Sequence, residues 1–232
     1  MNILLTGASR GIGAAAYDLL RSTGHNVVGH STRGGGELIA GDLSDPEAPR
    51  RIWEAAVNRL GRIDALVNNA GIYEGIADDA ADDDWQTAWQ RTLTINLTSA
   101  ADLCRLAIQH FKANGGGRIV NVASRAAFRG DSPQHWHYAA SKAGMIAMTK
   151  SIARGYAAEN VLAFAVCPGF TMTGMAEDYL GSRGGAKLLA DIPLGRVAEA
   201  SEVAETIRWL SVDAPPSATG AVIDVNGASY VR

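Results

Sequence analysis

The sequence is poor in cysteine, and this limits the kind of protein that it can encode. Cys104 and Cys167 are its only two cysteines; they stand far apart and lack the spacing of metal ligands. Two such residues cannot build a disulfide framework, so we expect a cytoplasmic protein in which both thiols are small buried groups. We also expect no catalytic metal, because the acidic residues from Asp78 to Asp84 are typical of a solvated loop that leads into a helix.

The sequence also lacks long apolar runs and a strong excess of one charge. No stretch approaches the roughly 20 apolar residues of a membrane span, and the opening MNILLTG has no basic region of a signal peptide. A net charge of −3 gives no electrostatic reason to expect nucleic acid or an anionic membrane as partner. With 47% apolar and 19% charged residues, the composition is typical of a soluble enzyme or binding domain, and we expect a small-molecule partner.

No internal repeat and no linker interrupts the chain, so we expect one domain over residues 1–232. Short apolar runs alternate with longer segments that have an apolar residue every three to four positions. This alternation predicts a doubly wound α/β fold, a single-domain Rossmann-type parallel sheet of about seven strands with helices on both faces. The predicted strands are Asn2–Thr6, Asn26–Ser31, Glu37–Ala40, Ala65–Asn68, Arg118–Ser124, Leu162–Cys167 and Ala221–Val225, and the predicted helices are Gly11–Ser22, Asp45–Leu60, Asp84–Lys112, Tyr138–Glu159 and Ser201–Val212.

One predicted crossover is unusually short. Only Thr32-Arg33-Gly34-Gly35-Gly36 separates the second predicted strand from the third. A parallel crossover normally takes a dozen or more residues and contains a helix. Three consecutive glycines do not form one, so we expect a tight loop at this point.

A glycine-rich turn follows the first predicted strand. The residues Thr6 to Gly13 read TGASRGIG and lead into a helical run. Glycines let the backbone turn sharply and approach a pyrophosphate, while the helix offers free N–H groups and the positive end of its dipole. The spacing differs from the commoner G-x-G-x-x-G, and a structural turn is the alternative, but the strand-to-helix context favours dinucleotide binding.

The end of the second predicted strand favours NADP(H) over NAD(H). NAD sites usually have an acidic residue about 20 positions after the glycine turn, whereas this strand ends in His30, Ser31, Thr32 and Arg33. Arg10 and Arg33 are placed to face a 2′-phosphate, and the Ser31 and Thr32 hydroxyls can donate to it. The alternative is that both arginines are ordinary surface cations and that the cofactor is NAD(H).

Further motifs follow in a fixed order: NNAG at 68–71, Asn96 in INLTS, Ser124 at the end of IVNVAS, YAASK at 138–142 and PG at 168–169. Together with TGASRGIG they resemble the classical short-chain dehydrogenase/reductase family, over almost the whole chain. The resemblance implies an NADP(H)-dependent oxidoreductase that transfers hydride between the nicotinamide and a carbonyl or secondary alcohol carbon. It also implies a homotetramer or homodimer, with the segments 84–112 and 138–159 forming one interface.

The resemblance implies four catalytic residues. Tyr138 is expected to act as the general acid/base, and Lys142, one helical turn on, to favour its ionised form and to hold the nicotinamide ribose. Ser124 is expected to bind the substrate oxygen, and Asn96 to hold a water that connects Lys142 with solvent. The alternatives are structural: Ser124 could simply end a strand, and Asn96 could make a hydrogen bond within its helix.

The resemblance also implies the remaining cofactor contacts, which come from turns at strand ends. Asn69, Ala70 and Gly71 are expected near the adenosine ribose, Asn68 is interpreted as structural, and Asp42 is expected to meet the adenine amino group. The full predicted set for the cofactor is Gly7, Ser9, Arg10, Gly11, Ile12, Gly13, Ser31, Thr32, Arg33, Asp42, Leu43, Asn69, Ala70, Gly71, Tyr138, Lys142, Pro168, Gly169, Thr171 and Thr173.

The sequence leaves the substrate open. His135, Trp136 and His137 precede Tyr138 and either touch the substrate or pack locally. Residues 172–193 are expected to form a small substrate lid, because glycines suit a mobile segment. A non-catalytic NADP(H)-binding sensor is the rival from another class, although a sensor needs no proton relay. The chain is too short for the larger substrate domain of the family's extended branch.

Overall fold

The computed structural model describes residues 1–172 and 185–232, and leaves aside the side chains of residues 186–188. The strands are β1 Asn2–Leu5, β2 Asn26–Ser31, β3 Ile39–Ala40, β4 Ala65–Asn68, β5 Gly117–Val122, β6 Val161–Pro168, β7 Thr171–Met172, β8 Ala198–Glu199 and β9 Val222–Val225. The helices are α1 Gly11–Ser22, α2 Ala48–Leu60, α3 Asp82–Leu93, α4 Ser99–Ala113, α5 Ala126–Arg129, α6 Trp136–Tyr156, α8 Gly185–Ala190 and α9 Ala200–Val212.

Seven strands form one parallel sheet in the order β3-β2-β1-β4-β5-β6-β9, while β7 and β8 form a small parallel pair beside it. The strand order reverses between β1 and β4, whose register pairs Leu4 with Leu66. In sheets of this kind, ligands bind at the carboxyl ends of the strands next to such a reversal. The predicted single-domain, doubly wound Rossmann-type fold with seven strands is confirmed.

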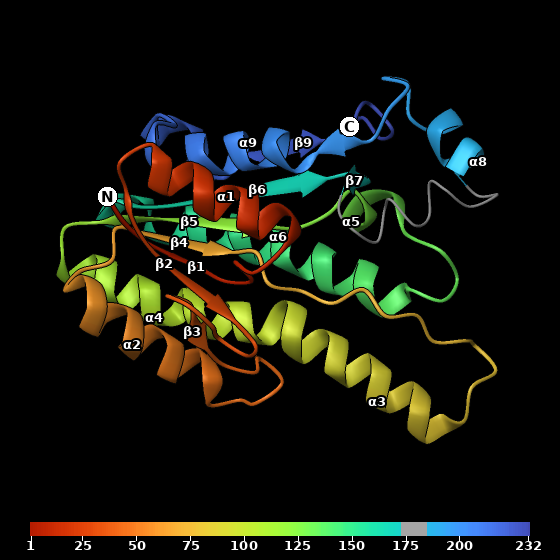
Figure 1. Ribbon diagram of the computed structural model, residues 1–232, viewed down its shortest axis with the longest axis horizontal. Coiled ribbons are helices and arrows are strands. Elements are labelled where there is room, and N and C mark those ends of the chain that lie inside the picture. The colour runs from red at the N-terminus through yellow and green to blue at the C-terminus, as the bar shows by residue number, and fades with distance from the viewer. Residues whose placement is uncertain (173–184) are drawn as a thin grey trace.

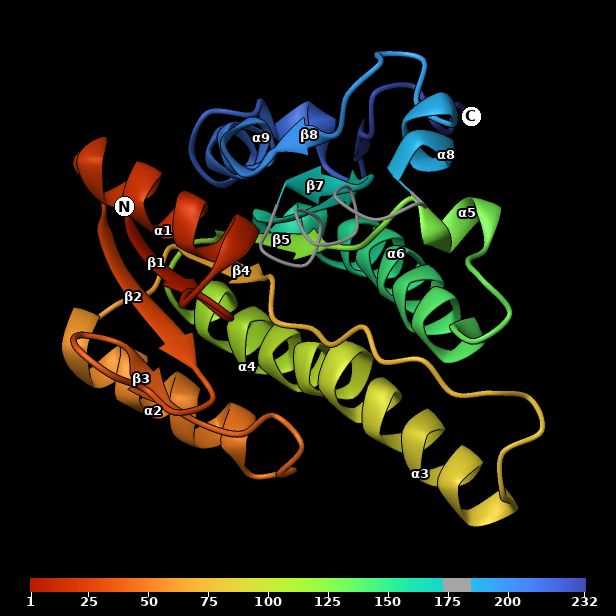
Figure 2. The same cartoon turned by 45° about the vertical axis from the view of Figure 1, so that its right-hand side comes forward.

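Helices cover both faces of the sheet, with α1 and α9 on one face and α2, α4 and α6 on the other (Figures 1 and 2). Successive side chains of a strand point to opposite faces, and β1 shows the result. Ile3 and Leu5 pack towards α1 and α9, whereas Leu4 belongs to the core beneath α2 and α4. Because both faces are covered, the strands are largely apolar, and polar residues such as His30, Asn68 and Asn121 are buried with hydrogen-bond partners.

The helix predicted over 84–112 is continuous, but its middle turn is not α-helical. α3 continues into a π-helical turn at Thr94–Thr98, and α4 follows directly. The predicted catalytic residue Asn96 lies in this turn, where it is buried. Such single π-turns within α-helices occur frequently at functional sites.

The predicted start of the second helix at Asp45 is wrong, since α2 begins at Ala48. Pro46 disfavours helical backbone at the residue before it. The Asp42 carboxylate accepts the Ser44 N–H, and the Asp45 carboxylate accepts the Glu47 N–H. These local turns keep the segment out of the helix, and neither Ser44 nor Asp45 caps it.

The crossover between β2 and β3 is the tight loop that the sequence predicted. Gly34, Gly35 and Gly36 all have positive φ, at 68°, 110° and 57°, a region that only glycine enters freely. The N–H groups of Gly34 and Gly41 both donate to the Ser31 carbonyl. The chain therefore reaches β3 without a helix, and β3 pairs with only His30 and Ser31.

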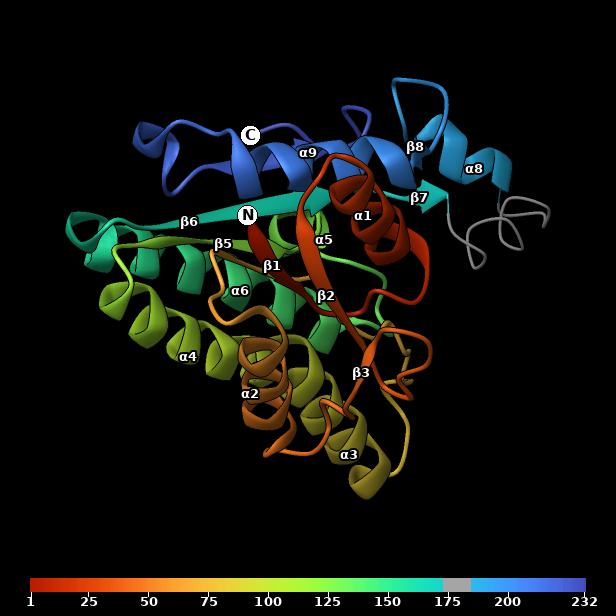
Figure 3. The same ribbon diagram turned by 60° about the vertical axis from the view of Figure 1, so that its left-hand side comes forward.

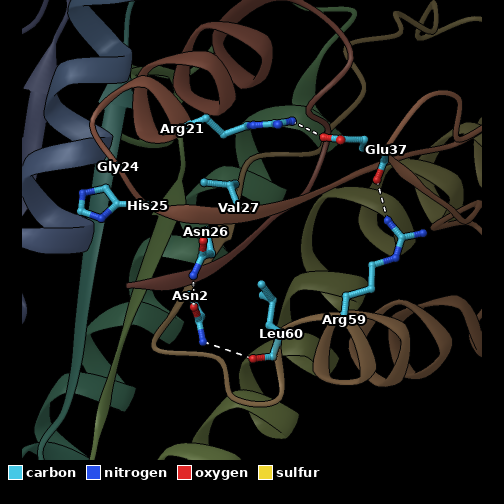
Figure 4. A pocket seen from close by; sticks show the side chains of 9 residues that line it. All are labelled: Asn2, Arg21, Gly24, His25, Asn26, Val27, Glu37, Arg59 and Leu60. Atoms are coloured by element: carbon cyan, nitrogen blue, oxygen red, sulfur yellow. Dashed lines mark hydrogen bonds and ion pairs between the residues drawn. The ribbon is translucent and has the colours of Figure 1, made fainter.

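Figure 3 shows β1 and β2 side by side. A hollow of about 710 Å³ lies beside the amino-terminal parts of these two strands (Figure 4). Arg21 and Arg59 reach Glu37 across it, the first at the carboxylate and the second at the backbone carbonyl. It lies at the end of the sheet opposite to the carboxyl ends of the strands, so we do not assign catalysis to it. Within the described ranges, no helix is both long and apolar enough to cross a membrane.

Candidate active site

The glycine-rich turn and the end of β4 fit together at the strand reversal. The Asn69 side chain donates to the carbonyls of Thr6 and Gly7, at 3.0 and 3.1 Å. A Cβ on Gly13 would lie 2.0 Å from the Gly7 oxygen, and one on Gly7 would lie 2.9 Å from Ala70 Cα. Both glycines are therefore required by close backbone contact, as the sequence predicted for this turn.

Thr6 is a residue that the sequence analysis did not single out. Its buried hydroxyl accepts the N–H groups of Asn69 and Ala70 at 3.0 and 3.1 Å. It thereby fixes the start of the loop after β4 against the end of β1. The sequence indicated this role through one feature: a hydroxyl-bearing residue stands directly before Gly7.

Lys142 lies at the centre of the site and is almost fully buried, with 3% of its surface exposed. Its Nζ donates to the Val122 carbonyl at 2.8 Å. A Cβ on Gly71 would lie 3.5 Å from this Nζ and 3.3 Å from Asn96 Oδ1. Lys142, Asn96 and the backbone at Gly71 therefore share one small volume, and burial lowers the Lys142 pKa to about 8.

The Asn96 side chain makes structural contacts, but these reach the loop after β4 and α6, whereas the alternative given from the sequence was a hydrogen bond within its own helix. Its Oδ1 accepts the Ile72 N–H at 2.8 Å, and its Nδ2 donates to the Ile72 carbonyl and to Ser141 Oγ. Asn96 therefore fixes the loop after β4 next to Lys142. The π-turn places this amide on the same side of the helix as the site.

Tyr138 lies in the first turn of α6, with the Lys142 Nζ 5.8 Å from the centre of its ring. Burial raises the pKa of Tyr138 to about 12, and hydrogen bonding by the Ser124 side chain opposes this rise. Desolvation of the phenolate is the largest cause of this rise, so burial favours the neutral phenol in the protein alone. The phenol is therefore neutral at physiological pH, and the effect of Lys142 on its ionisation stays a prediction.

An aromatic ring that the sequence did not connect with the site, that of Tyr73, flanks the phenol. The Tyr73 ring meets the Tyr138 ring edge-on at 4.9 Å and stacks on His135 at 3.9 Å. The Tyr73 hydroxyl donates to the Asp131 carboxylate, and His135 Nδ1 is 2.7 Å from Ser132 Oγ. Since 42% of the Tyr73 surface is exposed, this ring forms an accessible aromatic wall next to Tyr138.

His135, Trp136 and His137 have different positions, which answers the question that the sequence left open. His135 lies beside the site through Tyr73. Trp136 is exposed and meets Trp85 edge-on, whereas His137 is fully buried and packs on Trp89 of α3. Local packing therefore accounts for Trp136 and His137.

Among the residues predicted to bind the adenosine part of the cofactor, some are exposed and others already make contacts within the protein. Arg10, Thr32 and Arg33 are exposed, and neither arginine forms an ion pair within the described ranges. Ser31 is buried and its hydroxyl donates to the Gly34 carbonyl, so this group is used within the loop. Asp42 is exposed and accepts hydrogen bonds from Ser44, which lower its pKa, and Leu43 is buried in the apolar core.

The turn after β6 is held to the rest of the site by backbone contacts. The Gly169 N–H donates to the Val225 carbonyl, and the Pro168 carbonyl accepts the Arg125 N–H directly after Ser124. Thr171 is buried in β7. The predicted contact Thr173 and most of the predicted lid, residues 173–184, lie outside the described residues.

Asn68 is structural, as predicted. It is buried at the end of β4, and its Nδ2 donates to Asn121 Oδ1 at 2.9 Å, while Asn121 donates to Thr149 on α6. The acidic run Asp82–Asp84 lies exposed in the first turn of α3. Among the side chains of the described residues, no group of three or more His, Cys, Asp or Glu could hold a metal ion.

The residues present suit a dinucleotide. The first turn of α1 begins at Gly11 with free N–H groups and no acidic side chain. The Gly7–Gly13 contact holds this helix end close to the carboxyl ends of β1 and β4. An anion at this position would meet backbone donors and the positive end of the helix dipole.

Comparison with known proteins supports the same interpretation. A family model described as enoyl-(acyl carrier protein) reductase matches residues 7–228. The chain is 34% identical to the 3-oxoacyl-[acyl-carrier-protein] reductase FabG of Vibrio cholerae, with 98% of this chain and 96% of that protein aligned. It is 33% identical to the protein of that name from Thermotoga maritima, over 98% of this chain and 97% of the other.

This chain belongs to the short-chain dehydrogenase/reductase family. The resemblance inferred from the sequence motifs is thereby confirmed, and the chain is an enzyme, a short-chain oxidoreductase. The alignments cover nearly the whole chain.

Replacing Lys142 with methionine should stabilise the protein at pH 7 by about 2 kcal/mol, net of the lost hydrogen bond to Val122. The pKa of Lys142 falls from 10.5 to about 8 in the folded protein. Below pH 8 the lysine is charged in both states, and burial of this charge lowers the free energy of unfolding. This cost disappears as the pH rises from 8 to 10.5, because the folded protein then holds a neutral lysine. The free energies of unfolding of Lys142→Met and wild type, measured in urea, should differ at pH 7 and converge as the pH rises from 8 to 10.5. A variant that is less stable than wild type at pH 7 would contradict this.

Proposed function

We propose that this enzyme is an NADP(H)-dependent oxidoreductase that reduces a ketone carbonyl to a secondary alcohol, or catalyses the reverse. The main support is the position of one proton donor and one buried cation at the carboxyl ends of β4 and β5. Tyr138 interacts with Ser124, and Lys142 is held at the Val122 carbonyl beside Asn96. Two hydroxyl groups that face the same space suit a carbonyl oxygen, because each can donate to its lone pairs.

Each residue has a distinct role in this proposal. Ser124 donates to the substrate oxygen, and the neutral Tyr138 phenol gives that oxygen its proton as negative charge develops. The Lys142 ammonium stabilises the phenolate that is left and holds the nicotinamide ribose. Asn96 fixes the Ile72 backbone beside Lys142. A water next to Asn96 completes the proton path from Lys142 to solvent. A bound NADPH supplies the hydride.

The choice of NADP(H) over NAD(H) rests on the end of β2. Arg10 and Arg33 are exposed cations without a carboxylate partner in the described ranges, and no acidic side chain follows β2 where an NAD site has one. Thr32 is exposed beside them. In this proposal Asn69, Ala70 and Gly71 contact the adenosine ribose, and Pro168, Gly169 and Thr171 contact the nicotinamide. Thr173 lies outside the described residues, and its contact stays a prediction.

The names of the relatives suggest the first substrates to test. The FabG proteins are named for 3-oxoacyl groups carried by acyl carrier protein, so 3-oxoacyl thioesters are the substrate class that we propose first. The description of the family model names an enoyl reductase, but the Ser124–Tyr138 pair favours reduction at a carbonyl. We further propose a cytoplasmic homotetramer or homodimer with α4 and α6 in one interface.

Replacing Tyr138 with phenylalanine should lower the turnover of a 3-oxoacyl thioester by at least about 100-fold, because the proton donor is lost. Binding of NADPH, measured by energy transfer from tryptophan, should be retained. The matched control is Tyr156→Phe on the same helix, which should keep full activity. Undiminished turnover in Tyr138→Phe would contradict the proposal, and a wild type that binds NADPH but reduces no carbonyl would support the sensor alternative.

Wild-type protein should bind NADPH at least tenfold more tightly than NADH, a difference of about 1.4 kcal/mol. Replacing Arg10 and Arg33 together with glutamine should remove this preference and leave the affinity for NADH unchanged. Fluorescence titrations of both proteins with both cofactors measure the effect. Tighter binding of NADH by the wild type would show that the interpretation of β2 is wrong.

A further inference from the structure

His30 stands where three parts of the proposed cofactor site meet, and no role has been assigned to it so far. It lies near the end of β2 and only 2% of its surface is exposed. Its Nδ1 is 3.4 Å from the Gly7 N–H of the glycine-rich turn, and its Nε2 is 2.8 Å from the Gly41 carbonyl that precedes Asp42. One imidazole therefore connects the turn after β1 with the loop after β3.

The two partners determine the form of the ring. The Gly7 N–H can only donate, so Nδ1 must be an acceptor, and the Gly41 carbonyl can only accept, so Nε2 must carry the proton. Only the neutral imidazole with its proton on Nε2 satisfies both. A second proton on Nδ1 would face the Gly7 N–H and bring a positive charge next to the amino end of α1.

The position of His30 gives this bond a consequence for the cofactor. Gly7 contacts Gly13 and Ala70, so a shift of its N–H moves the pyrophosphate turn. The Ala8 N–H also donates to the His30 carbonyl, at 2.8 Å. Because the β2–β3 crossover lacks a helix, His30 is one of the few contacts that hold Gly41, together with the Gly41 N–H bond to the Ser31 carbonyl and the two paired residues of β3.

We propose that His30 is a positioning residue for the dinucleotide, which in its neutral form holds the glycine-rich turn and the Asp42 loop in the binding geometry and on protonation weakens dinucleotide binding. The inference rests on the proposed NADP(H) dependence of the enzyme. It adds a pH-dependent control of cofactor affinity that acts through a side chain below the site.

The surroundings of His30 favour the neutral form. Burial lowers its pKa below 6.5, and the hydrogen bond to Gly41 only partly offsets this. The charged groups on the neighbouring elements are Arg10 in the turn, Arg33 and Glu37 in the crossover, Asp42 and Asp45 after β3, and Glu47, Arg50, Arg51 and Glu54 on α2. None of them contributes to the shift, so the ring responds to pH without an ion-pair partner.

The sign of the effect follows from this lowered pKa. His30 is neutral at pH 8 and becomes protonated only as the pH falls below 6.5. If only the neutral form binds, the apparent Kd rises about tenfold for each pH unit below the midpoint of His30. Bound dinucleotide should lower this midpoint further, because binding and protonation oppose each other.

The experiment measures the Kd of NADP⁺ by calorimetry from pH 8 to pH 5, for wild type and two variants. His30→Gln keeps a donor for the Gly41 carbonyl, and His30→Asn keeps an acceptor for the Gly7 N–H, and neither side chain titrates. The NADP⁺ 2′-phosphate itself titrates near pH 6, so the readout is the ratio of wild-type to variant Kd at each pH. Circular dichroism at pH 8 and pH 5 controls for folding of each protein.

We expect the ratio of wild-type to variant Kd to be constant near pH 8 and to rise about tenfold per pH unit below the His30 midpoint. Nitrogen-15 NMR of the imidazole, with the His30 resonance identified by its loss in His30→Gln, should show the proton on Nε2 at pH 8. A flat ratio down to pH 5, or a proton on Nδ1, would overturn this inference alone. Absence of NADP⁺ binding by the wild type at pH 8 would overturn the proposed function and this inference with it.

Discussion

The site depends on a lysine ammonium that is buried at the carboxyl ends of β4 and β5. Lys142 donates to the Val122 carbonyl and lies beside Gly71 and Asn96. Burial of a cation costs free energy, and for this reason the pKa of Lys142 is lowered. The π-turn, Gly71 and the hydrogen bonds of Asn96 to Ile72 lie around this charge. They keep it within reach of the Tyr138 phenol, which burial keeps protonated.

The sequence predicted those features that depend on local pattern. Strands buried on both faces are largely apolar, so all seven strands of the main sheet were found, and Gly7 and Gly13 stand where only glycine fits. The π-turn at Thr94–Thr98 could not be predicted, because one extra residue in a turn hardly changes an apolar period of three to four. The stack of Tyr73 on His135 also escaped prediction, because its two members are far apart in the sequence and meet only through the fold.

The pKa of Tyr138 shows where reasoning from a motif was incomplete. The spacing of Tyr138 and Lys142 correctly placed a cation near the phenol, but it carried no information on burial. In the folded protein, desolvation raises the phenol pKa to about 12. A raised pKa makes the phenol a weaker acid, so proton transfer in either direction needs a group that stabilises the phenolate, which in the proposed mechanism is Lys142 together with the bound cofactor.

Transfer of deuterium from NADPH labelled at C4 tests the central claim most directly. The account predicts that a single turnover with a 3-oxoacyl thioester places deuterium on the carbon that carried the ketone oxygen, with the new hydroxyl proton coming from solvent. Mass spectrometry and NMR of the product locate the label. If the labelled cofactor is oxidised and the product carries no deuterium at this carbon, the proposed hydride transfer to a carbonyl is contradicted.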